Sequence, residues 1–154
     1  MNTDKKISRR EALKRMGFAL MSGAIASSGL LSLASCETKR SKRIIFYFTG
    51  TGNSLYIARQ LAGENAELLS IPQMVKRGKY EFEADEIGIV YPIYGHMPPY
   101  MVRQFIQKAK LKAEYKFAVL TYGARKCDAV EIWDRISRKA DNAFDYISTI
   151  IMVD

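Results

Sequence analysis

Short apolar runs alternate along the chain with segments whose apolar residues recur at helical spacing. Runs of this kind, flanked by polar or glycine-containing segments, are typical of β-strands. One run, Ile87–Tyr91, is apolar throughout and follows Asp85 and Glu86, which indicates a strand buried on both faces. The predicted strands are Ile44–Phe48, Ala66–Ser70, Ile87–Tyr91, Phe117–Leu120 and Ile147–Val153.

Three of the intervening segments predict helices. The first helix is expected over about Ser54–Gly63, and the second opens with Met97-Pro98-Pro99, which places prolines in its first turn. Asp128 and Glu131 have the spacing of a capping box at the start of the third. Gln73–Asp85 is expected to be a charged connection. The predicted apolar faces are Val102, Phe105, Ile106 and Ala109 in the second helix, and Ala129, Ile132, Ile136 and Ala140 in the third.

This alternation of strand and helix predicts an α/β fold with a doubly wound parallel sheet, covered by helices on both sides. In such folds, ligands bind beyond the carboxyl ends of the strands, beside the first strand. Three loops are expected at that edge: Thr49–Ser54, Pro92–Met97 and Thr121–Lys126.

The first of these loops has the chemistry of a phosphate site without lysine. Its glycines let main-chain N–H groups approach an anion, and the following helix directs its unpaired N–H groups at the loop. Hydroxyl and amide groups can supply the remaining hydrogen bonds to a phosphate monoester. Neither a Gly-Lys-Ser/Thr P-loop nor a Gly-x-Gly-x-x-Gly dinucleotide motif is present. The alternative is that the glycines only build a tight turn. The loop residues are Thr49, Gly50, Thr51, Gly52, Asn53 and Ser54.

This loop resembles that of the flavodoxin family, in which hydroxyl-x-Thr-Gly-x-Thr follows a small apolar strand and precedes an alanine and a leucine. Here the loop is followed by Ala58 and Leu61, and Ser54 stands where threonine is usual. The resemblance covers residues 43–154 and is greatest to a subgroup in which a flavodoxin domain precedes a ferredoxin (4Fe-4S) domain. It implies the strand order 2-1-3-4-5 and the cofactor FMN.

The resemblance also implies that the other two loops hold the isoalloxazine ring of FMN. Tyr94 would stack on one face of the ring, and Gly95 would bring a peptide group near flavin N5. Thr121, Tyr122 and Gly123 would offer backbone N–H groups and a second aromatic ring. The alternative for each tyrosine is ordinary partial burial at the sheet edge. His96 is expected to be a loop residue that contacts solvent.

The N-terminal segment resembles a bacterial export leader. Ser8–Lys14 resembles a twin-arginine motif, a mildly apolar segment follows, and Leu33–Cys36 resembles a lipobox. We therefore expect a signal peptide over residues 1–35, lipidation of Cys36 and a basic tether over residues 36–43. An uncleaved anchor helix is the alternative.

Both interpretations of the leader predict an exported protein on the periplasmic side of a bacterial membrane, attached to that membrane. Twin-arginine export carries folded proteins, which suits a domain that acquires its flavin inside the cell. The basic tether would either contact anionic headgroups or be a solvated linker.

Charge is unevenly distributed along the sequence. Residues 1–43 carry a net +7 of the formal +8, and residues 44–154 carry only +1. The high isoelectric point therefore belongs to the leader and tether, and nucleic-acid binding is not expected.

Cysteine usage excludes several classes of site. With Cys36 assigned to lipid, Cys127 remains, and it is expected to be a small residue at a helix start. The chain has no Cys-x-x-Cys motif and no histidine cluster, so no metal or iron–sulfur site is expected in it.

The predicted FMN-binding domain, residues 44–154, ends directly after its fifth strand. Family members continue through a last helix, so the domain is expected to be C-terminally incomplete: a fragment, a truncated product, or a domain completed by a partner. An uncovered apolar edge strand would favour aggregation.

The leading expectation is an FMN-binding electron-transfer protein, tethered to the membrane by lipid, whose redox partner protein or iron–sulfur domain lies outside this chain. Arg125 and Lys126 would raise the flavin potential if they lie near N1, or else point to solvent. The rivals are an FMN-dependent reductase of quinones or small electrophiles, and a lipoprotein binding module without flavin.

Overall fold

A computed structural model describes residues 42–152. The predicted signal peptide, the lipidation site Cys36 and most of the tether lie outside the described residues, as do Val153 and Asp154. Among the residues described, no helix is long and apolar enough to cross a membrane.

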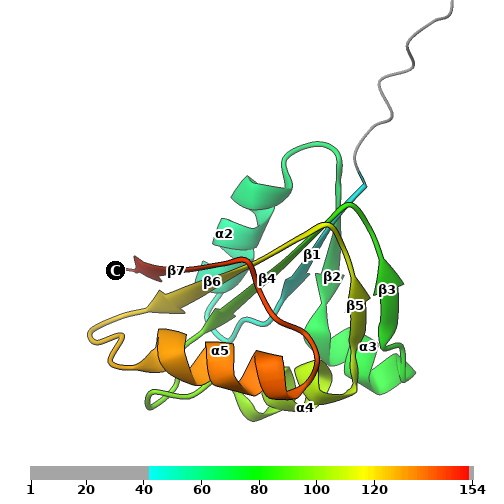
Figure 1. The fold of residues 1–154 in the computed structure, drawn as a ribbon. Coiled ribbons are helices and arrows are strands. Elements are labelled where there is room, and N and C mark those ends of the chain that lie inside the picture. Colours follow the sequence, from blue (N-terminus) through cyan, green and yellow to red (C-terminus); the bar gives the residue numbers. More distant parts are fainter. Residues whose placement is uncertain (1–41, 153–154) are drawn as a thin grey trace, which may run out of the picture. The chain divides into compact units, whose positions relative to one another are not determined.

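The described chain alternates strands and helices around one central sheet (Figure 1). The strands are β1 (Arg43–Tyr47), β2 (Ala66–Ser70), β3 (Glu81–Glu83), β4 (Glu86–Pro92), β5 (Lys110–Lys112), β6 (Tyr115–Tyr122) and β7 (Tyr146–Ile151). The helices are α2 (Asn53–Ala62), α3 (Ile71–Arg77), α4 (Tyr100–Lys108) and α5 (Ala129–Lys139).

The central sheet has the order β2-β1-β4-β6-β7, and all of its pairings are parallel. This confirms the expected α/β fold and the order 2-1-3-4-5, counted over the strands of the central sheet. Helix α2 lies on one face of the sheet, and α3, α4 and α5 lie on the other (Figure 1). The carboxyl ends of β1, β4 and β6 therefore meet at one edge.

Strand β4 lies at the centre of the sheet and is buried from Ile87 to Tyr91, as its unbroken apolar sequence predicted. Successive side chains point to opposite faces, so Ile89 and Tyr91 pack under α3, α4 and α5, whereas Val90 packs under α2. Gly88 faces the α2 side, where an added Cβ would lie 2.5 Å from Phe117 Cζ and 2.7 Å from Ile45 Cδ1. The close packing of these neighbours explains the glycine.

The prediction of a plain charged connection over Gln73–Asp85 was wrong. Helix α3 occupies its first part, with Pro72 in the first turn and Gly78 in the left-handed conformation at its end. These are ordinary start and stop signals, but the helix is too short for its apolar spacing to be recognised. Strand β3 occupies the next part and pairs in parallel with β5, another short strand that the sequence analysis missed.

Two details of the helix starts also differ from the expectation. Helix α4 begins at Tyr100, after Pro98 and Pro99, which are buried ahead of the first turn. The predicted capping box at α5 was wrong, because Asp128 makes no side-chain capping bond there. Its carboxylate instead lies 3.3 Å from His96 Nδ1.

The apolar face of α4 was predicted correctly, since Val102, Phe105, Ile106 and Ala109 are all buried. In α5 the buried face is rotated from the expectation. Trp133 and Ser137 are completely buried, whereas Ile136 and Ala140 are only half-buried. Trp133 packs between Tyr91 and Phe144, with ring centroids 4.9 and 5.3 Å away.

Candidate functional site

A cleft of about 280 Å³ lies where the three loops meet at the carboxyl edge of the sheet. Each loop follows one of the predicted strands β1, β4 and β6. The parallel pairing of these strands brings the three loops together, although they are far apart in the sequence. Three lining residues were not among the expected site residues: Pro92, Ile93, and Met152, which directly follows β7. Met152 lay within the predicted strand Ile147–Val153, near its carboxyl end, and that position was the available signal. The lining residues are Thr49, Gly50, Thr51, Asn53, Ser54, Pro92, Ile93, Tyr94, Thr121, Tyr122, Gly123 and Met152.

Backbone hydrogen bonds hold the loops against one another. Ile93 N–H donates to Thr121 O at 2.8 Å, and Met152 N–H donates to Tyr122 O at 2.8 Å. Phe48 N–H donates to Val90 O at 2.9 Å, which ties the start of the first loop to β4. The cleft is therefore supported by the sheet itself.

The first loop is held in shape by its own side chains. Gly52 N–H donates to Thr49 Oγ1 at 2.9 Å, and Gly52 adopts a φ of 101°, which side-chain-bearing residues rarely adopt. Ser54 Oγ and Thr121 Oγ1 lie 2.8 Å apart in a buried pair that joins the first loop to the third. One hydroxyl of this pair donates to the other, which leaves the second hydroxyl's proton free for a further acceptor.

Helix α2 begins at this loop without a side-chain cap, because the N-cap position is Gly52. Its first N–H groups and its positive dipole end therefore face the loop. An anion bound there would satisfy the donors that a capping side chain usually satisfies. Thr51 and Asn53 line the same part of the cleft and can donate further hydrogen bonds.

The second loop is a tight turn that carries Tyr94 across the first loop. Tyr94 and Met97 exchange backbone hydrogen bonds of 3.0 and 3.1 Å. Gly95 and His96 between them have φ values of 52° and 72°, positive at both central positions as in a type I′ turn. A Cβ added at Gly50 would lie 2.6 Å from Tyr94 Oη, so the phenol hydroxyl lies beside the first loop.

Not every expected site residue lines the cleft. Gly52 and Gly95 belong to the loops but shape their backbones, since both have positive φ and an added Cβ would meet no atom within 4 Å. Tyr94 is 51% exposed and Tyr122 is half-buried, so both rings lie at the rim. His96 is exposed as expected, and it also pairs with Asp128.

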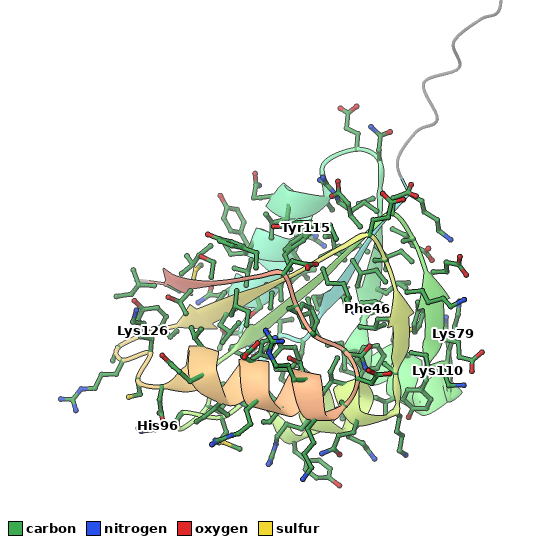
Figure 2. The ribbon with its side chains drawn as sticks, in the orientation of Figure 1. Phe46, Lys79, His96, Lys110, Tyr115 and Lys126 are labelled. Carbon is green, nitrogen blue, oxygen red and sulfur yellow. The ribbon has the colours of Figure 1, made fainter. Side chains whose placement is uncertain are left out.

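The end of the third loop is exposed. Arg125, Lys126 and Cys127 all lie at the surface, and Figure 2 shows Lys126 on the outer side of the connection between β6 and α5. Cys127 has a φ of 46° and precedes the first residue of α5, Ala129, by two positions. It stands directly before the N-cap residue Asp128, at the start of a helix as expected. Among residues 42–152, no three His, Cys, Asp or Glu side chains come together as metal ligands would.

Several solved structures share this architecture. A flavoprotein in complex with FMN from Lactobacillus acidophilus NCFM matches with a TM-score of 0.52 at 12% identity, over 71% of this chain and 93% of the other. A candidate flavoprotein from Bacteroides eggerthii DSM 20697 gives 0.54 at 17% identity, over 73% and 88%. Two-electron reduced flavodoxin from Megasphaera elsdenii gives 0.50 at 20% identity, over 72% and 85%.

The fold is flavodoxin-like. No protein-family profile matches the chain, and no curated protein sequence matches it significantly. At these identities the likeness extends to the fold, and the site has to be argued from its own residues.

Proposed function

We propose that this chain is an FMN-binding electron-transfer protein, exported and tethered by lipid to the periplasmic side of a bacterial membrane. The observation that carries the proposal is the uncapped start of α2, surrounded by the Thr49–Ser54 loop at the edge of a flavodoxin-like sheet. FMN-bound and flavodoxin structures among the fold neighbours support the same cofactor.

The residues present fit a phosphate monoester. Thr51, Asn53 and the α2 N–H groups would hold the phosphate, and the Ser54–Thr121 pair would offer one further hydroxyl proton. Gly50 has no side chain, and this leaves room for the Tyr94 hydroxyl. A side chain at position 50 would occupy that space. The dipoles of helix α2 and of the hydroxyl and amide groups would neutralise the phosphate charge, so the site needs no lysine.

The rim residues fit a planar ring. Tyr94 and Tyr122 present aromatic surface at the mouth of the cleft, and the Gly95 peptide sits in the turn between Tyr94 and Met97. FMN, when bound, supplies the electron-transfer chemistry. The protein would hold the phosphate, orient the ring and limit its contact with water, and no side chain needs to act as a catalytic acid or base.

The test compares FMN with riboflavin, which lacks the phosphate, on the purified full chain. Fluorescence quenching should show saturable FMN binding, and Thr51→Ala should weaken it about tenfold or more, the value of one hydrogen bond to a charged group. Riboflavin binding should not change. Thr149→Ala, a matched change on β7 outside the cleft, should leave FMN affinity unaltered. A colourless protein that fails to take up added FMN would overturn the proposal.

The rival function, reduction of quinones or small electrophiles, needs an open ring face for a second substrate. The 51% exposure of Tyr94 at the rim is the observation that favours it. Stopped-flow oxidation of the reduced protein by a quinone separates the two. Saturation with quinone concentration indicates a substrate site, whereas a simple second-order rate indicates a carrier.

Two further parts of the proposal have separate tests. Replacing both Arg125 and Lys126 with glutamine should lower the midpoint potential of the flavin, because positive charge near the ring stabilises the negative charge added on reduction. No shift in a redox titration would mean that both point to solvent.

For the tether, Cys36→Ala should move the protein from the membrane fraction to the soluble fraction. Unchanged fractionation would contradict lipidation.

A further inference from the structure

A second concave region is lined by residues of α4 and α5 and by Met97. Both helices lie on the face of the sheet opposite α2 (Figure 1). This α4–α5 groove has a volume of about 470 Å³ and is lined by Met97, Arg103, Gln107, Arg135, Ile136, Lys139 and Ala140. Its floor is apolar, formed by Met97, Ile136 and Ala140. Its other lining residues include three cations and no acid. An apolar floor beside several positive charges fits a ligand that is both apolar and acidic.

Arg103 contributes to the groove a buried N–H group that needs a hydrogen-bond acceptor. Its Nε is buried and has no hydrogen-bond partner among the described residues. The guanidinium lies over the Tyr100 ring, 5.8 Å from the centroid, and Tyr100 is 72% exposed. A buried N–H without an acceptor is costly, and a guanidinium can donate two parallel hydrogen bonds to one carboxylate. Arginine and tyrosine are also the residue types that dominate binding energy at interfaces.

The positive charges of the groove are not neutralised from within the domain. In the described part of the chain, Arg103, Arg135 and Lys139 make no ion pair within 4 Å, and Asp134 of α5 is instead held by Arg138 at 2.8 Å. Glu131, one turn before Arg135, is the acid on the same side of α5. Helix α4 carries Arg103 and Lys108 and no acid. The net local charge is therefore positive.

The groove adjoins the flavin cleft through a single turn. Met97 lines the groove, and it exchanges two backbone hydrogen bonds with Tyr94, which lines the cleft. A molecule seated in the groove would therefore contact one side of the Tyr94–Met97 turn while the other side faces the cofactor site. A molecule docked in the groove would therefore lie next to the proposed cofactor site.

We propose that the α4–α5 groove docks the electron-transfer partner, a protein that presents a carboxylate next to an apolar side chain. The inference rests on the proposed function, because the partner is named by its redox role. The carboxylate would pair with Arg103 between Arg135 and Lys139, and the apolar side chain would cover Ile136 and Met97. An inorganic anion would not need the apolar floor, and a membrane surface would not enter a concave groove.

An interface of this kind should be weak and sensitive to salt. Transient redox complexes bury little surface, and complementary charge mainly accelerates the encounter. Exposed charges separated by more than about 8 Å are largely screened at physiological ionic strength. The affinity should therefore fall steeply with added salt.

The test uses a synthetic helical peptide with glutamate and leucine at i, i+4 spacing, titrated into the ¹⁵N-labelled full chain. The Nε–H resonance of Arg103 and the amides of Met97 and Ile136 should shift together and saturate. Arg103→Gln should raise Kd about tenfold, the value of one hydrogen bond between charged groups. Arg135→Gln, at an exposed position, provides a second variant should Arg103→Gln unfold. Arg59→Gln removes an exposed charge from α2 and is the matched control.

The controls separate docking from general attraction. A peptide with leucine replaced by serine should bind more weakly if the floor is used, and one with glutamate replaced by lysine should not bind. Equal effects of Arg59→Gln and Arg103→Gln, or shifts spread over exposed lysines such as Lys79 and Lys110 without saturation, would overturn the proposal. FMN affinity of each variant is measured in parallel, so a failure of docking is distinguished from a failure of flavin binding.

Discussion

The two faces of the central sheet are built very differently. Under α3, α4 and α5, a continuous core includes Phe46, Phe105 and Trp133, and several of its aromatic rings lie within 6.2 Å of one another. Under α2, the buried cluster is smaller: Ile45, Ala58, Ala62, Val90 and Val119. Its neighbours Phe117 and Ile150 are only half-buried.

Because of this difference, the face that contributes most to stability is not the face that carries the candidate site. The larger core supplies most of the buried apolar surface, which is the main favourable term in folding. The α2 face contributes fewer buried side chains, and its helix begins at the Thr49–Ser54 loop. The start of α2 can therefore be shaped for a ligand while the opposite face maintains the fold.

The largest expected effect is removal of Trp133 from the larger core. Trp133→Ala should lower the free energy of unfolding by about 3–5 kcal/mol, because it leaves a cavity between Tyr91 and Phe144. Urea denaturation measures it. Trp133→Phe should cost much less, since it keeps a ring and removes an indole N–H that has no partner within residues 42–152. Similar losses for the two variants would argue against a packing role.

Asn142 should give the next largest effect, because it joins the ends of three elements of the same face. Its side chain donates to Ile106 O, Ala109 O and Ala140 O and accepts from Leu111 N–H, at 2.8–3.2 Å. Asn142→Ala leaves these buried groups unpaired and should cost about 3 kcal/mol. The denaturation midpoint should fall without a change in slope. An unchanged midpoint would show that water replaces the side chain.

A substitution at Gly88 tests whether the packing on the α2 face can accommodate an added methyl group. Gly88→Ala forces a methyl group against Phe117 and Ile45, and it should cost about 1–3 kcal/mol, as other overpacked sites do. Phe117 is half-buried, so Phe117→Leu in the same chain should recover part of the loss. A double-mutant cycle should give a coupling of at least about 0.5 kcal/mol. Additive losses would mean that strand β4 itself moves.

The smallest effect concerns Tyr91 at alkaline pH. Burial raises the pKa of its hydroxyl well above 10, so the folded state favours the protonated form. This contribution to stability is fully present below about pH 10, the pKa in the unfolded chain, and is lost as pH rises above it. Tyr91→Phe should reduce this loss and cost little at pH 7, because the hydroxyl has no hydrogen-bond partner in the part of the chain that the structure describes. An unchanged alkaline slope would assign the effect to other groups.

Much of the fold follows from local pattern. The strands of the central sheet, three of the helices and the edge where the loops meet were all predicted, because buried parallel strands are continuous apolar runs. The short elements α3, β3 and β5 were missed, since too few residues carry their periodicity. Helix α5 starts where it was predicted to, with Asp128 at the N-cap, but the predicted capping box was wrong, because the Asp128 carboxylate lies against His96 and makes no capping bond.

The candidate site divides in the same way. The sequence alone determined the Thr49–Ser54 loop, because its glycines, hydroxyls and following helix are adjacent in the chain and act through backbone geometry. Only the tertiary structure decided how that loop is completed. Tyr94 lies beside Gly50, Ser54 pairs with Thr121 across 67 positions, and Met97 connects the cleft to the α4–α5 groove. Such contacts depend on the register of parallel strands, which distant segments set together and local sequence does not encode.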